Sequence, residues 1–260
     1  MGIKGLFTFL KRWEQPVDTK EAIKNKSVGL DIFWFIHQSK GDIAGLQAAI
    51  SVFLQYALTV HAVFDGHFAT QERREELEER RDKRYRAIEI MEEIMEAPIM
   101  EKRDQKVLER HMTQLKRQIW KPSRSYIDQI KCWLIENNAI IHEPIGEADQ
   151  TLIMMENMEI INLIVTNDSD LISLGAETVL RVETLRRIET PRSMVLRVET
   201  PRSMVLRNGT ILSKTHMRKQ MGFTKECWKD FMYLCQKMEP LIAYSMIRVY
   251  KEHAVERYLA

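Results

Sequence analysis

Acidic residues recur at the ends of short apolar runs in this chain, and that recurrence constrains the fold more than any other feature. Six of them form four clusters: Asp31, Asp65, Glu147 with Asp149, and Asp168 with Asp170. A carboxylate that ends an apolar strand lies at the edge where open parallel sheets bind their ligands. Several carboxylates at one edge repel one another strongly unless divalent cations neutralise them. The pattern therefore favours magnesium-assisted phosphoryl chemistry.

Short β-branched runs alternate with long helical patterns from Val28 to about Leu180. The expected strands cover residues 27–31, 61–65, 139–143, 161–166 and 177–182. This alternation predicts an α/β fold with a mostly parallel central sheet and helices on both faces. Helical patterns with many aromatic residues then cover 212–260, which predicts a small C-terminal helical region at 208–260.

A long helical tract at 71–137 separates the second and third acidic clusters, with breaks at Pro98 and Pro122. It is too long for a plain connection. Residues 102–124 carry eight Lys/Arg against two acids, and residues 73–86 mix arginines with glutamates. For 73–86 alone, a solvated face with ion pairs between successive turns is the better interpretation. The nearby acidic clusters shift the balance towards phosphate contacts.

Composition narrows the class of protein. Three cysteines, without CxxC spacing, argue against a disulfide framework or a zinc site and favour a reducing compartment. No apolar run is long enough to span a membrane. The formal net charge is only +2, so any contact with nucleic acid has to come from local basic patches.

An internal repeat follows the predicted sheet. Residues 189–197 recur letter for letter at 199–207, which indicates a recent duplication within an insertion at 181–207. The insertion is basic. It is either a hairpin that contacts nucleic acid or an extended surface ribbon, and the ribbon is the favoured interpretation.

Together these motifs resemble those of the flap endonuclease and XPG group of structure-specific 5′-nucleases, over most of residues 1–180. The group's opening stands here as Met1-Gly-Ile-Lys-Gly-Leu6, and its Val-Phe-Asp-Gly as Val63–Gly66. Its Glu-Ala-Glu-Ala signature stands as Glu147-Ala-Asp-Gln150, with Asp replacing the second Glu. Its Thr-x-Asp-x-Asp stands as Thr166-Asn-Asp-Ser-Asp170.

The resemblance implies a PIN-like nuclease core at 1–180 that cleaves flapped or branched DNA with two Mg²⁺ ions, for which Mn²⁺ can substitute. It assigns Asp65, Glu147 and Asp149 to one ion and Asp168 and Asp170 to the other. Asp31 is assigned to metal-bound waters; taken alone, it reads better as a helix N-cap.

The tract at 71–137 resembles the group's helical arch, through which a single-stranded 5′ end passes. The resemblance implies these DNA contacts: Gly2, His37, Arg73, Arg74, Arg80, Arg81 and Arg84. Arg80 and Arg81 are also catalytic candidates, because cations near the scissile phosphate stabilise developing charge. His37 is expected either to stack on a terminal base or to be a partly buried helical histidine.

Two departures from the group's pattern affect these expectations. Met238 stands where the group has a further metal-binding Asp, so Glu239 either reaches the metals after local adjustment or leaves the second ion weakly held. In addition, Pro240–Met246 contains no glycine, where the group has a glycine-rich turn that binds duplex DNA. Weaker or altered duplex recognition is expected.

The expected partner is DNA with a 5′ flap or branch, bound by a monomer without a sliding-clamp motif or membrane contact. A compact, viral-type member acting in the nucleus or at a viral replication site is expected. Two alternatives stay open: a DNA-binding or assembly protein that has lost turnover, and an RNA-directed nuclease on the same scaffold.

Overall fold

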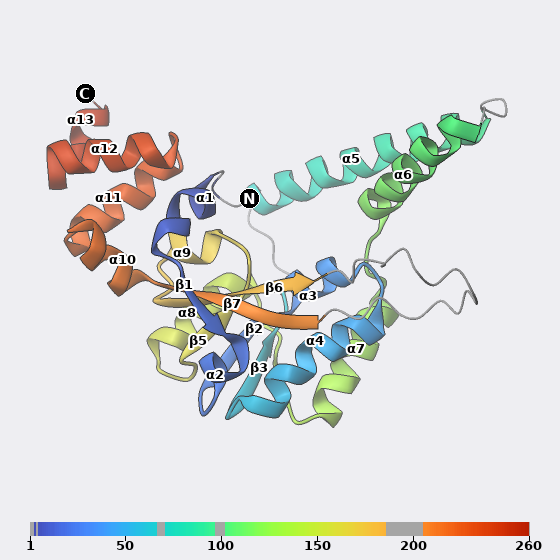
Figure 1. The fold of residues 1–260 in the computed structure, drawn as a ribbon, viewed down its shortest axis with the longest axis horizontal. Coiled ribbons are helices and arrows are strands. Elements are labelled where there is room, and N and C mark those ends of the chain that lie inside the picture. Colours follow the sequence, from blue (N-terminus) through green and yellow to red (C-terminus); the bar gives the residue numbers. More distant parts are fainter. Residues whose placement is uncertain (1–2, 4, 67–70, 97–101, 186–204, 260) are drawn as a thin grey trace.

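The computed structural model describes residues 3, 5–66, 71–96, 102–185 and 205–259 (Figure 1). Its centre is a seven-stranded sheet with the order β1-β7-β6-β5-β2-β3-β4. The strands are β1 (Gln15–Asp18), β2 (Ser27–Asp31), β3 (Thr59–Val63), β4 (Ile140–His142), β5 (Leu163–Val165), β6 (Thr178–Leu185) and β7 (Val205–Ser213). Strands β6, β5, β2, β3 and β4 are parallel, whereas β7 pairs antiparallel with both β6 and β1. The predicted α/β class with a mostly parallel sheet is confirmed.

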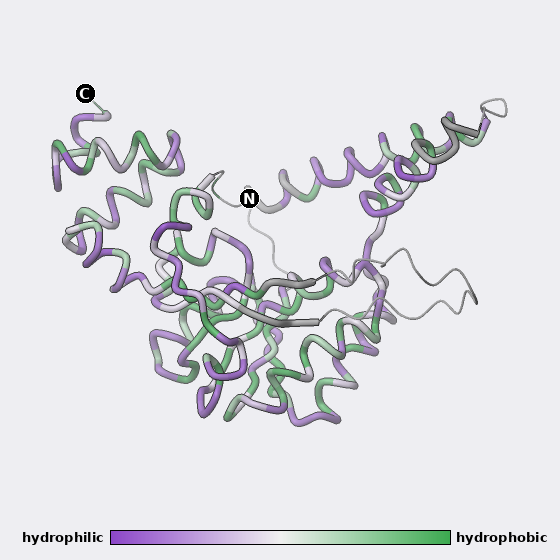
Figure 2. Tube along the Cα trace, viewed as in Figure 1, coloured by the Kyte–Doolittle hydropathy of each residue, from purple (hydrophilic) through white to green (hydrophobic). Residues whose placement is uncertain are grey.

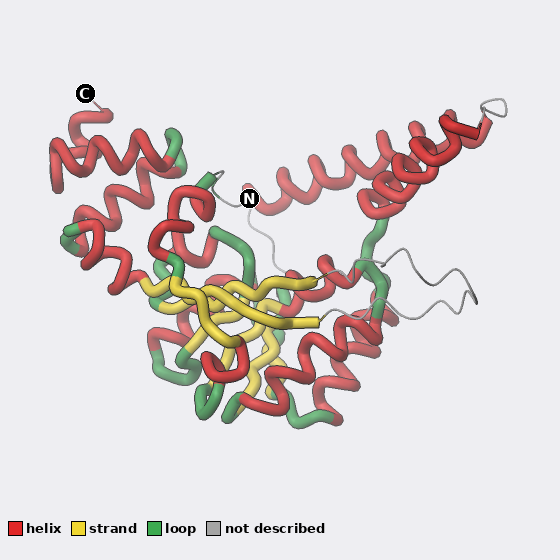
Figure 3. Tube along the Cα trace, viewed as in Figure 1, coloured by secondary structure: helices red, strands yellow, loops and turns green. Residues whose placement is uncertain are grey.

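Helices cover both faces of this sheet (Figure 3). The α-helices are α1 (Leu6–Leu10), α2 (Thr19–Ile23), α3 (Ile32–Ser39), α4 (Ile43–Tyr56), α5 (Gln71–Glu96), α6 (Lys102–Ile119), α7 (Arg124–Glu136), α8 (Ala148–Asn157), α9 (Asp170–Leu174), α10 (Lys214–Met221), α11 (Lys225–Cys235), α12 (Pro240–Tyr250) and α13 (Ala254–Leu259). Among the described helices, none has the length and apolar character needed to cross a membrane.

Successive residues of the strands belong to two separate hydrophobic cores, one on each face of the sheet. In β5, Ile164 packs with α1, α8 and the C-terminal helices, while Leu163 and Val165 pack with α3, α4 and α7. This is the expected result when successive side chains of a strand point to opposite faces. At Gly29 of β2, a Cβ would lie only 2.7 Å from Leu152 of α8, so glycine allows α8 to pack directly on the strand.

The helices α5 and α6 form a hairpin that projects from the body of the molecule (Figure 1). Both are largely hydrophilic along their length, as Figure 2 shows. At 26 residues, α5 is about 39 Å long. In contrast, α7 ends the long helical tract inside the body, where Ile130 and Leu134 are buried in one of the cores.

Sequence reasoning missed β1 and most of β7. The repeat insertion expected at 181–207 contributes both of its ends to the sheet: Arg181 pairs with Thr210, and Leu185 pairs with Val205. Residues 186–204, which carry most of the repeat, lie outside the described residues. The expected strand at 61–65 is observed at Thr59–Val63, so Asp65 follows β3 by two residues.

The C-terminal helices α10 to α13 pack around α1. Phe9 of α1 lies 5.6 Å, between ring centroids, from both Phe231 of α11 and Tyr244 of α12. Trp228 and Phe231 are almost completely buried. This aromatic cluster ties the N-terminal helix to the C-terminal region within one of the two hydrophobic cores.

Candidate metal and nucleic-acid site

A cavity of about 1070 Å³ lies at the edge where the parallel strands β2, β3 and β5 end. All six carboxylates of the four sequence clusters line it: Asp31, Asp65, Glu147, Asp149, Asp168 and Asp170. They come from segments up to 139 positions apart in the chain, and the parallel sheet brings them together because its strands end at one edge. We call these six residues the acidic wall.

Asp31 is held in the acidic wall by two hydrogen bonds. It is the last residue of β2 and also the N-cap of α3, where its Oδ1 accepts the backbone N–H of Trp34 at 3.2 Å. Its Oδ2 accepts the Thr166 hydroxyl at 2.9 Å. Burial raises the pKa of Asp31 to about 6, although both hydrogen bonds act in the opposite direction. The N-cap interpretation of Asp31 is therefore correct and compatible with its place in the cavity.

Asp65 is held by the chain segment that carries the third cluster. Its Oδ1 accepts the backbone N–H of Ala148, at the start of α8, at 3.1 Å. The next residue, Gly66, donates its backbone N–H to the Gly146 carbonyl at 2.8 Å. A Cβ at position 66 would lie 2.1 Å from the carbonyl oxygen of Pro144. The glycine that follows Asp65 is therefore required for the two segments to lie side by side.

Glu147 and Asp149 enter the cavity from the first turn of α8. Glu147 occupies the N-cap position, but its side chain makes no capping hydrogen bond. Burial raises the pKa of Asp149 to about 8, and four surrounding aspartates add to the rise. The carboxylates thus lie close enough to repel one another, and a cation between them would relieve this repulsion.

Thr166 connects the acids of β2 with those after β5. Its side chain is completely buried; the hydroxyl donates to Asp31 and accepts the backbone N–H of Asp168 at 3.1 Å. Asp168 in turn accepts the backbone N–H of Asp170 at 3.1 Å through its Oδ1. The first residue of the Thr-x-Asp-x-Asp motif therefore links Asp31 to the segment that carries Asp168 and Asp170.

The donor set suits Mg²⁺ or Mn²⁺, since both prefer the hard oxygen ligands that carboxylates supply. Within the described ranges, no three His, Cys, Asp or Glu side chains are already gathered closely enough to hold one ion. The fit to divalent cations therefore depends on the chemistry of the acidic wall and on its mutual repulsion.

Basic residues also line the cavity. Four cationic residues of α5 are part of the lining, and we call them the cationic wall: Arg80, Lys83, Arg84 and Arg86. Ala87 and Ile90 of the same helix also line the cavity. Positions 80, 83, 84 and 87 follow the spacing of one helical face. Lys83 and Arg86 were missed from the sequence, although this periodicity from Arg80 points to Lys83.

Other predicted arch contacts lie elsewhere. Arg81 and Arg74 are exposed on α5 and do not line the cavity. The backbone of Arg73 is in α5, but its side chain is outside the described part of the structure, as is all of Gly2.

Aromatic side chains from α3 and the α6–α7 connection complete the cavity. His37 is exposed there rather than buried, with its ring 6.1 Å from that of Trp120 at an interplanar angle of 86°. Lys40 also lines the cavity, and its Nζ lies 5.7 Å from the Trp120 ring centroid. Burial, together with the charge of Arg117, lowers the pKa of Lys40. Neither Lys40 nor Trp120 was identified from the sequence.

Glu239 is not brought to the cavity. It is exposed at the N-cap position of α12, and Met238 before it packs against the hydrophobic core. The next residue, Pro240, lies beside Gly5. A Cβ atom added to Gly5 would be 4.0 Å from the Cδ of Pro240, which is van der Waals distance. The packing of α12 on the N-terminal segment therefore holds this region away from the acidic wall.

Solved structures of DNA-processing enzymes share this architecture. The catalytic core of Rad2 in complex with a DNA substrate has a TM-score of 0.58 and 12% identity, over 99% of this chain and 72% of the Rad2 chain. Human GEN1 in complex with Holliday junction DNA has a TM-score of 0.57 and 13% identity, over 99% of this chain and 57% of the GEN1 chain. Flap endonuclease-1 from Methanococcus jannaschii has a TM-score of 0.55 and 14% identity, over 95% and 78%.

No protein-family model and no curated protein sequence matches this chain. The fold and the acidic edge of the sheet define the class as an α/β fold of the 5′-nuclease type. More particularly, the chain has the flap endonuclease/XPG fold, as the likeness to the Rad2, GEN1 and archaeal structures shows. At 12–14% identity, the likeness establishes the fold and leaves the activity to be argued from the site.

Proposed function

We propose that the protein is a structure-specific nuclease that hydrolyses phosphodiester bonds in flapped or branched DNA with two divalent cations, Mg²⁺ or Mn²⁺. One observation carries the proposal: six carboxylates from four chain segments and four cations of α5 line one cavity. Oxygens suited to metal ions and cations suited to phosphate thus line the same space. A phosphate between them would contact both.

Bound cations would supply the activation of water and the stabilisation of charge on the phosphate. Asp65, Glu147 and Asp149 are assigned to one ion and Asp168 and Asp170 to the other. The chain's own contribution is positioning: Thr166 fixes Asp31 and Asp168 by hydrogen bonds, so the acidic wall is ordered before substrate binds.

The cationic wall acts on the substrate. Arg80 and Arg84 would hold phosphate oxygens by charge-assisted hydrogen bonds, which strengthen as negative charge develops. The exposed ring of His37 beside Trp120 offers a surface for a base next to the scissile phosphate. The single-stranded 5′ end would then pass along α5 and α6.

The test is cleavage of a 5′-labelled flap duplex by the wild type, Asp65→Ala and Asp168→Ala. We expect cutting near the branch with Mg²⁺ or Mn²⁺ and none with EDTA. Each substitution should lower the rate by more than about 100-fold, because loss of even an outer-shell partner of a metal ligand costs roughly 10–100-fold. Cleavage at the wild-type rate by both variants would contradict the proposal. An RNA flap of equal sequence, cut faster than DNA, would redirect it to RNA.

A second candidate, a DNA-binding or assembly protein without turnover, is favoured by one observation. Met238 and Glu239 do not line the cavity, and among the described residues the lining has six carboxylates rather than seven. This candidate predicts that folded wild-type protein binds the flap duplex but does not cut it at millimolar Mg²⁺ or Mn²⁺. Cleavage that both aspartate substitutions remove excludes it.

A further inference from the structure

A second cavity, of about 650 Å³, lies between the end of α9 and the helices α10 and α11. We call it the α11 pocket. Cavities of about 300–1,000 Å³ are typical of sites that bind a small molecule. Leu174, the last residue of α9, lines both this pocket and the carboxylate cavity, but none of the six carboxylates of the acidic wall lines the α11 pocket. It is therefore a separate space with a chemistry of its own.

One face of α11 lines the pocket, and the character of this face changes along the helix. The lining positions follow the spacing of one helical face: Lys225, Trp228, Lys229, Met232, Tyr233 and Gln236. The first half carries two lysines, whereas the second half carries a thioether, a phenol ring and an amide. Lys225 and Tyr233 are about 12 Å apart along the helix axis. A ligand that fills the pocket therefore meets cations at one end and an apolar, hydrogen-bonding surface at the other.

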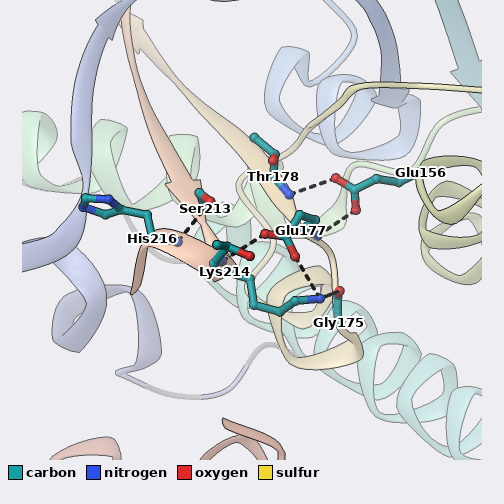
Figure 4. A network of polar contacts seen from close by, with 8 residues as sticks. Glu156, Gly175, Glu177, Thr178, Ser213, Lys214 and His216 are labelled. Atoms are coloured by element: carbon teal, nitrogen blue, oxygen red, sulfur yellow. Dashed lines mark hydrogen bonds and ion pairs between the residues drawn. The ribbon is translucent and has the colours of Figure 1, made fainter. Parts of the chain in front are cut away.

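Hydrogen bonds fix one wall of the α11 pocket (Figure 4). Lys214 donates from Nζ to the Gly175 carbonyl at 2.7 Å, and Nζ lies 3.2 Å from a carboxylate oxygen of Glu177. Glu177 also accepts the backbone N–H of Thr215 at 2.9 Å. Among the described residues, Glu177 is the one acid of the lining, and Lys214 already engages it. This pair leaves the other cations of the pocket without an acid in the lining to neutralise them.

Three cations of the lining are therefore in place for a ligand: Arg218 of α10, and Lys225 and Lys229 of α11. The Arg218 carbonyl accepts the backbone N–H of Phe223 at 2.9 Å, so Arg218 lies beside the turn that leads to Lys225. Among the described residues, none hydrogen-bonds to the buried Nε of Arg218. Like charges gathered around one pocket repel one another, and a bound polyanion relieves this repulsion. Three positive charges match a di- or triphosphate chain better than a single carboxylate.

The other end of the pocket suits a planar ring. Tyr233 and Leu174 are 38% and 50% exposed, so their apolar surfaces are open to a ligand. Bases of every kind stack on such a tyrosine ring, because each base has a π-face. Gln236 lines the same end, and its amide offers both donors and an acceptor to the edge of a base. A phosphate chain joined to a planar ring with a polar edge is a nucleotide, whereas an inorganic polyphosphate would use the cationic end alone.

We propose that the α11 pocket binds a free nucleoside di- or triphosphate, with its phosphates on Arg218, Lys225 and Lys229 and its base against Tyr233. The site uses no residue of the acidic or the cationic wall, so it is independent of the proposed nuclease function. The ligand is a monomer whose base enters the pocket. It contacts the end of α9, the short helix that begins at Asp170 of the acidic wall.

The test is isothermal titration calorimetry with ATP, GTP, CTP and UTP, each alone, and with inorganic tripolyphosphate. EDTA is present throughout, so that no metal ion holds a probe at the acidic wall. Lys225→Ala/Lys229→Ala should weaken the binding of the best nucleotide and of tripolyphosphate by at least about tenfold, since charge-assisted hydrogen bonds to phosphate are lost. Both lysines are exposed, so the melting temperature should not change.

Tyr233 separates a nucleotide from a bare phosphate chain. Tyr233→Ala should weaken the best nucleotide by about tenfold, because a base loses the ring on which it stacks. The same variant should bind tripolyphosphate like the wild type. Tyr233→Phe keeps the ring and should bind both probes like the wild type. If Tyr233→Ala leaves nucleotide binding unchanged, or weakens both probes equally, the pocket does not recognise a base and the proposal is overturned.

Two control variants remove charge elsewhere. Lys20→Ala/Lys24→Ala changes two exposed lysines at the other end of the sheet, beside the beginning of β2. Arg80→Ala/Arg84→Ala removes two cations of the carboxylate cavity. Both variants should bind the nucleotide with wild-type affinity.

Four results overturn the nucleotide site. The first is a wild type that binds none of the four nucleotides at millimolar concentration. The second is an equal loss in the Lys225/Lys229 and Lys20/Lys24 variants, which would mean attraction to net charge alone. A loss in the Arg80/Arg84 variant would put the nucleotide in the carboxylate cavity. Displacement of the nucleotide by excess flap duplex would make the pocket part of a DNA-binding surface. All these measurements are made without metal ions, so none of the four results decides the nuclease proposal.

Discussion

The two walls of the carboxylate cavity are built in different ways. In the acidic wall, Asp31 and Asp168 are held by Thr166 and by backbone N–H groups at the ends of buried strands. In the cationic wall, Lys83 pairs with Glu79 at 2.8 Å, but the two side chains are 65% and 52% exposed. Such exposed pairs contribute little stability. The acidic wall is thus fixed in advance, whereas the cations can exchange protein partners for phosphate.

The elements that carry the two walls also differ in how firmly they are held. The acidic wall stands where buried strands of the central sheet end and α8 and α9 begin, with a hydrophobic core on each face of the sheet. The cationic wall stands on α5, which is hydrophilic along most of its length and projects from the body (Figure 2). Ligands for a metal need fixed geometry, and phosphate steering depends mainly on charge. The construction of each wall matches the task proposed for it.

The largest expected effect is that of Asp149→Asn, which should change cleavage and stability in opposite directions. Cleavage should fall by more than about 100-fold, as expected for a lost metal ligand. The protein without metal should nevertheless become more stable at neutral pH, because the folded wild type has to hold a proton on Asp149 that the unfolded chain releases, and the Asn variant does not. Thermal melting in EDTA at several pH values measures this.

The pH dependence of that gain has a defined sign. The pKa of Asp149 is raised from 3.8 to about 8 in the folded protein. Between these values the folded state binds more protons than the unfolded state, so wild-type stability falls as pH rises. Near pH 4 the two proteins should differ little, and by pH 8 the Asn variant should melt higher. A gap that stays constant with pH would contradict the assigned repulsion.

Thr166→Val tests how much the acidic wall depends on its internal hydrogen bonds. The substitution keeps the shape but removes the hydroxyl that serves Asp31 and Asp168. Leaving these groups unsatisfied should cost about 1–3 kcal/mol of stability. Cleavage should fall by roughly 10–100-fold, the usual cost of losing an outer-shell partner.

The matched variant is Thr166→Ser, which keeps the hydroxyl and removes a methyl group. It should retain most of the cleavage activity. If Val and Ser variants cut equally well, the hydroxyl does not organise the acidic wall. Denaturant unfolding and steady-state cleavage, measured on both proteins, decide this.

The parallel sheet could be predicted because its strands are buried and flanked by helices, which gives short apolar runs in the sequence. β1 was not predicted because it is a polar edge strand that contains Pro16. A strand at the edge of a sheet tolerates proline, whereas a central strand does not. The start of β7 lay within the repeat, whose identity at 189–197 and 199–207 suggested an insertion rather than a strand.

The acidic wall could be predicted for the same reason as the sheet, since each acid follows an apolar run. Thr166 was quoted as part of a motif, but its hydrogen bonds across to Asp31 depend on β2 and β5 being neighbours. Lys40 and Trp120 join the cavity only through tertiary packing, because they are 80 positions apart. Glu239 illustrates the converse: its position in the sequence could not show that α12 holds it away from the cavity.

The smallest loss of activity is expected from substitutions in the cationic wall. These substitutions test which face of α5 meets the substrate, because the sequence pointed to Arg81 and Arg84 alike. Arg84 lines the cavity, and Arg81 does not. Loss of one charge-assisted hydrogen bond to phosphate costs about 1.5 kcal/mol. Arg84→Ala should therefore lower kcat/KM for a flap duplex by about tenfold. Arg81→Ala removes the same charge from the same helix and should change kcat/KM by less than about twofold.

Because both arginines belong to a projecting helix, neither substitution should change the melting temperature. A larger loss with Arg81→Ala than with Arg84→Ala would mean that the substrate meets a different face of α5 from the one that lines the cavity. Equal losses would mean that α5 acts only through its summed charge, and raising the salt concentration would then reduce both effects together. A loss confined to Arg84 that persists at higher salt would show that the cationic wall, like the acidic one, acts through defined positions.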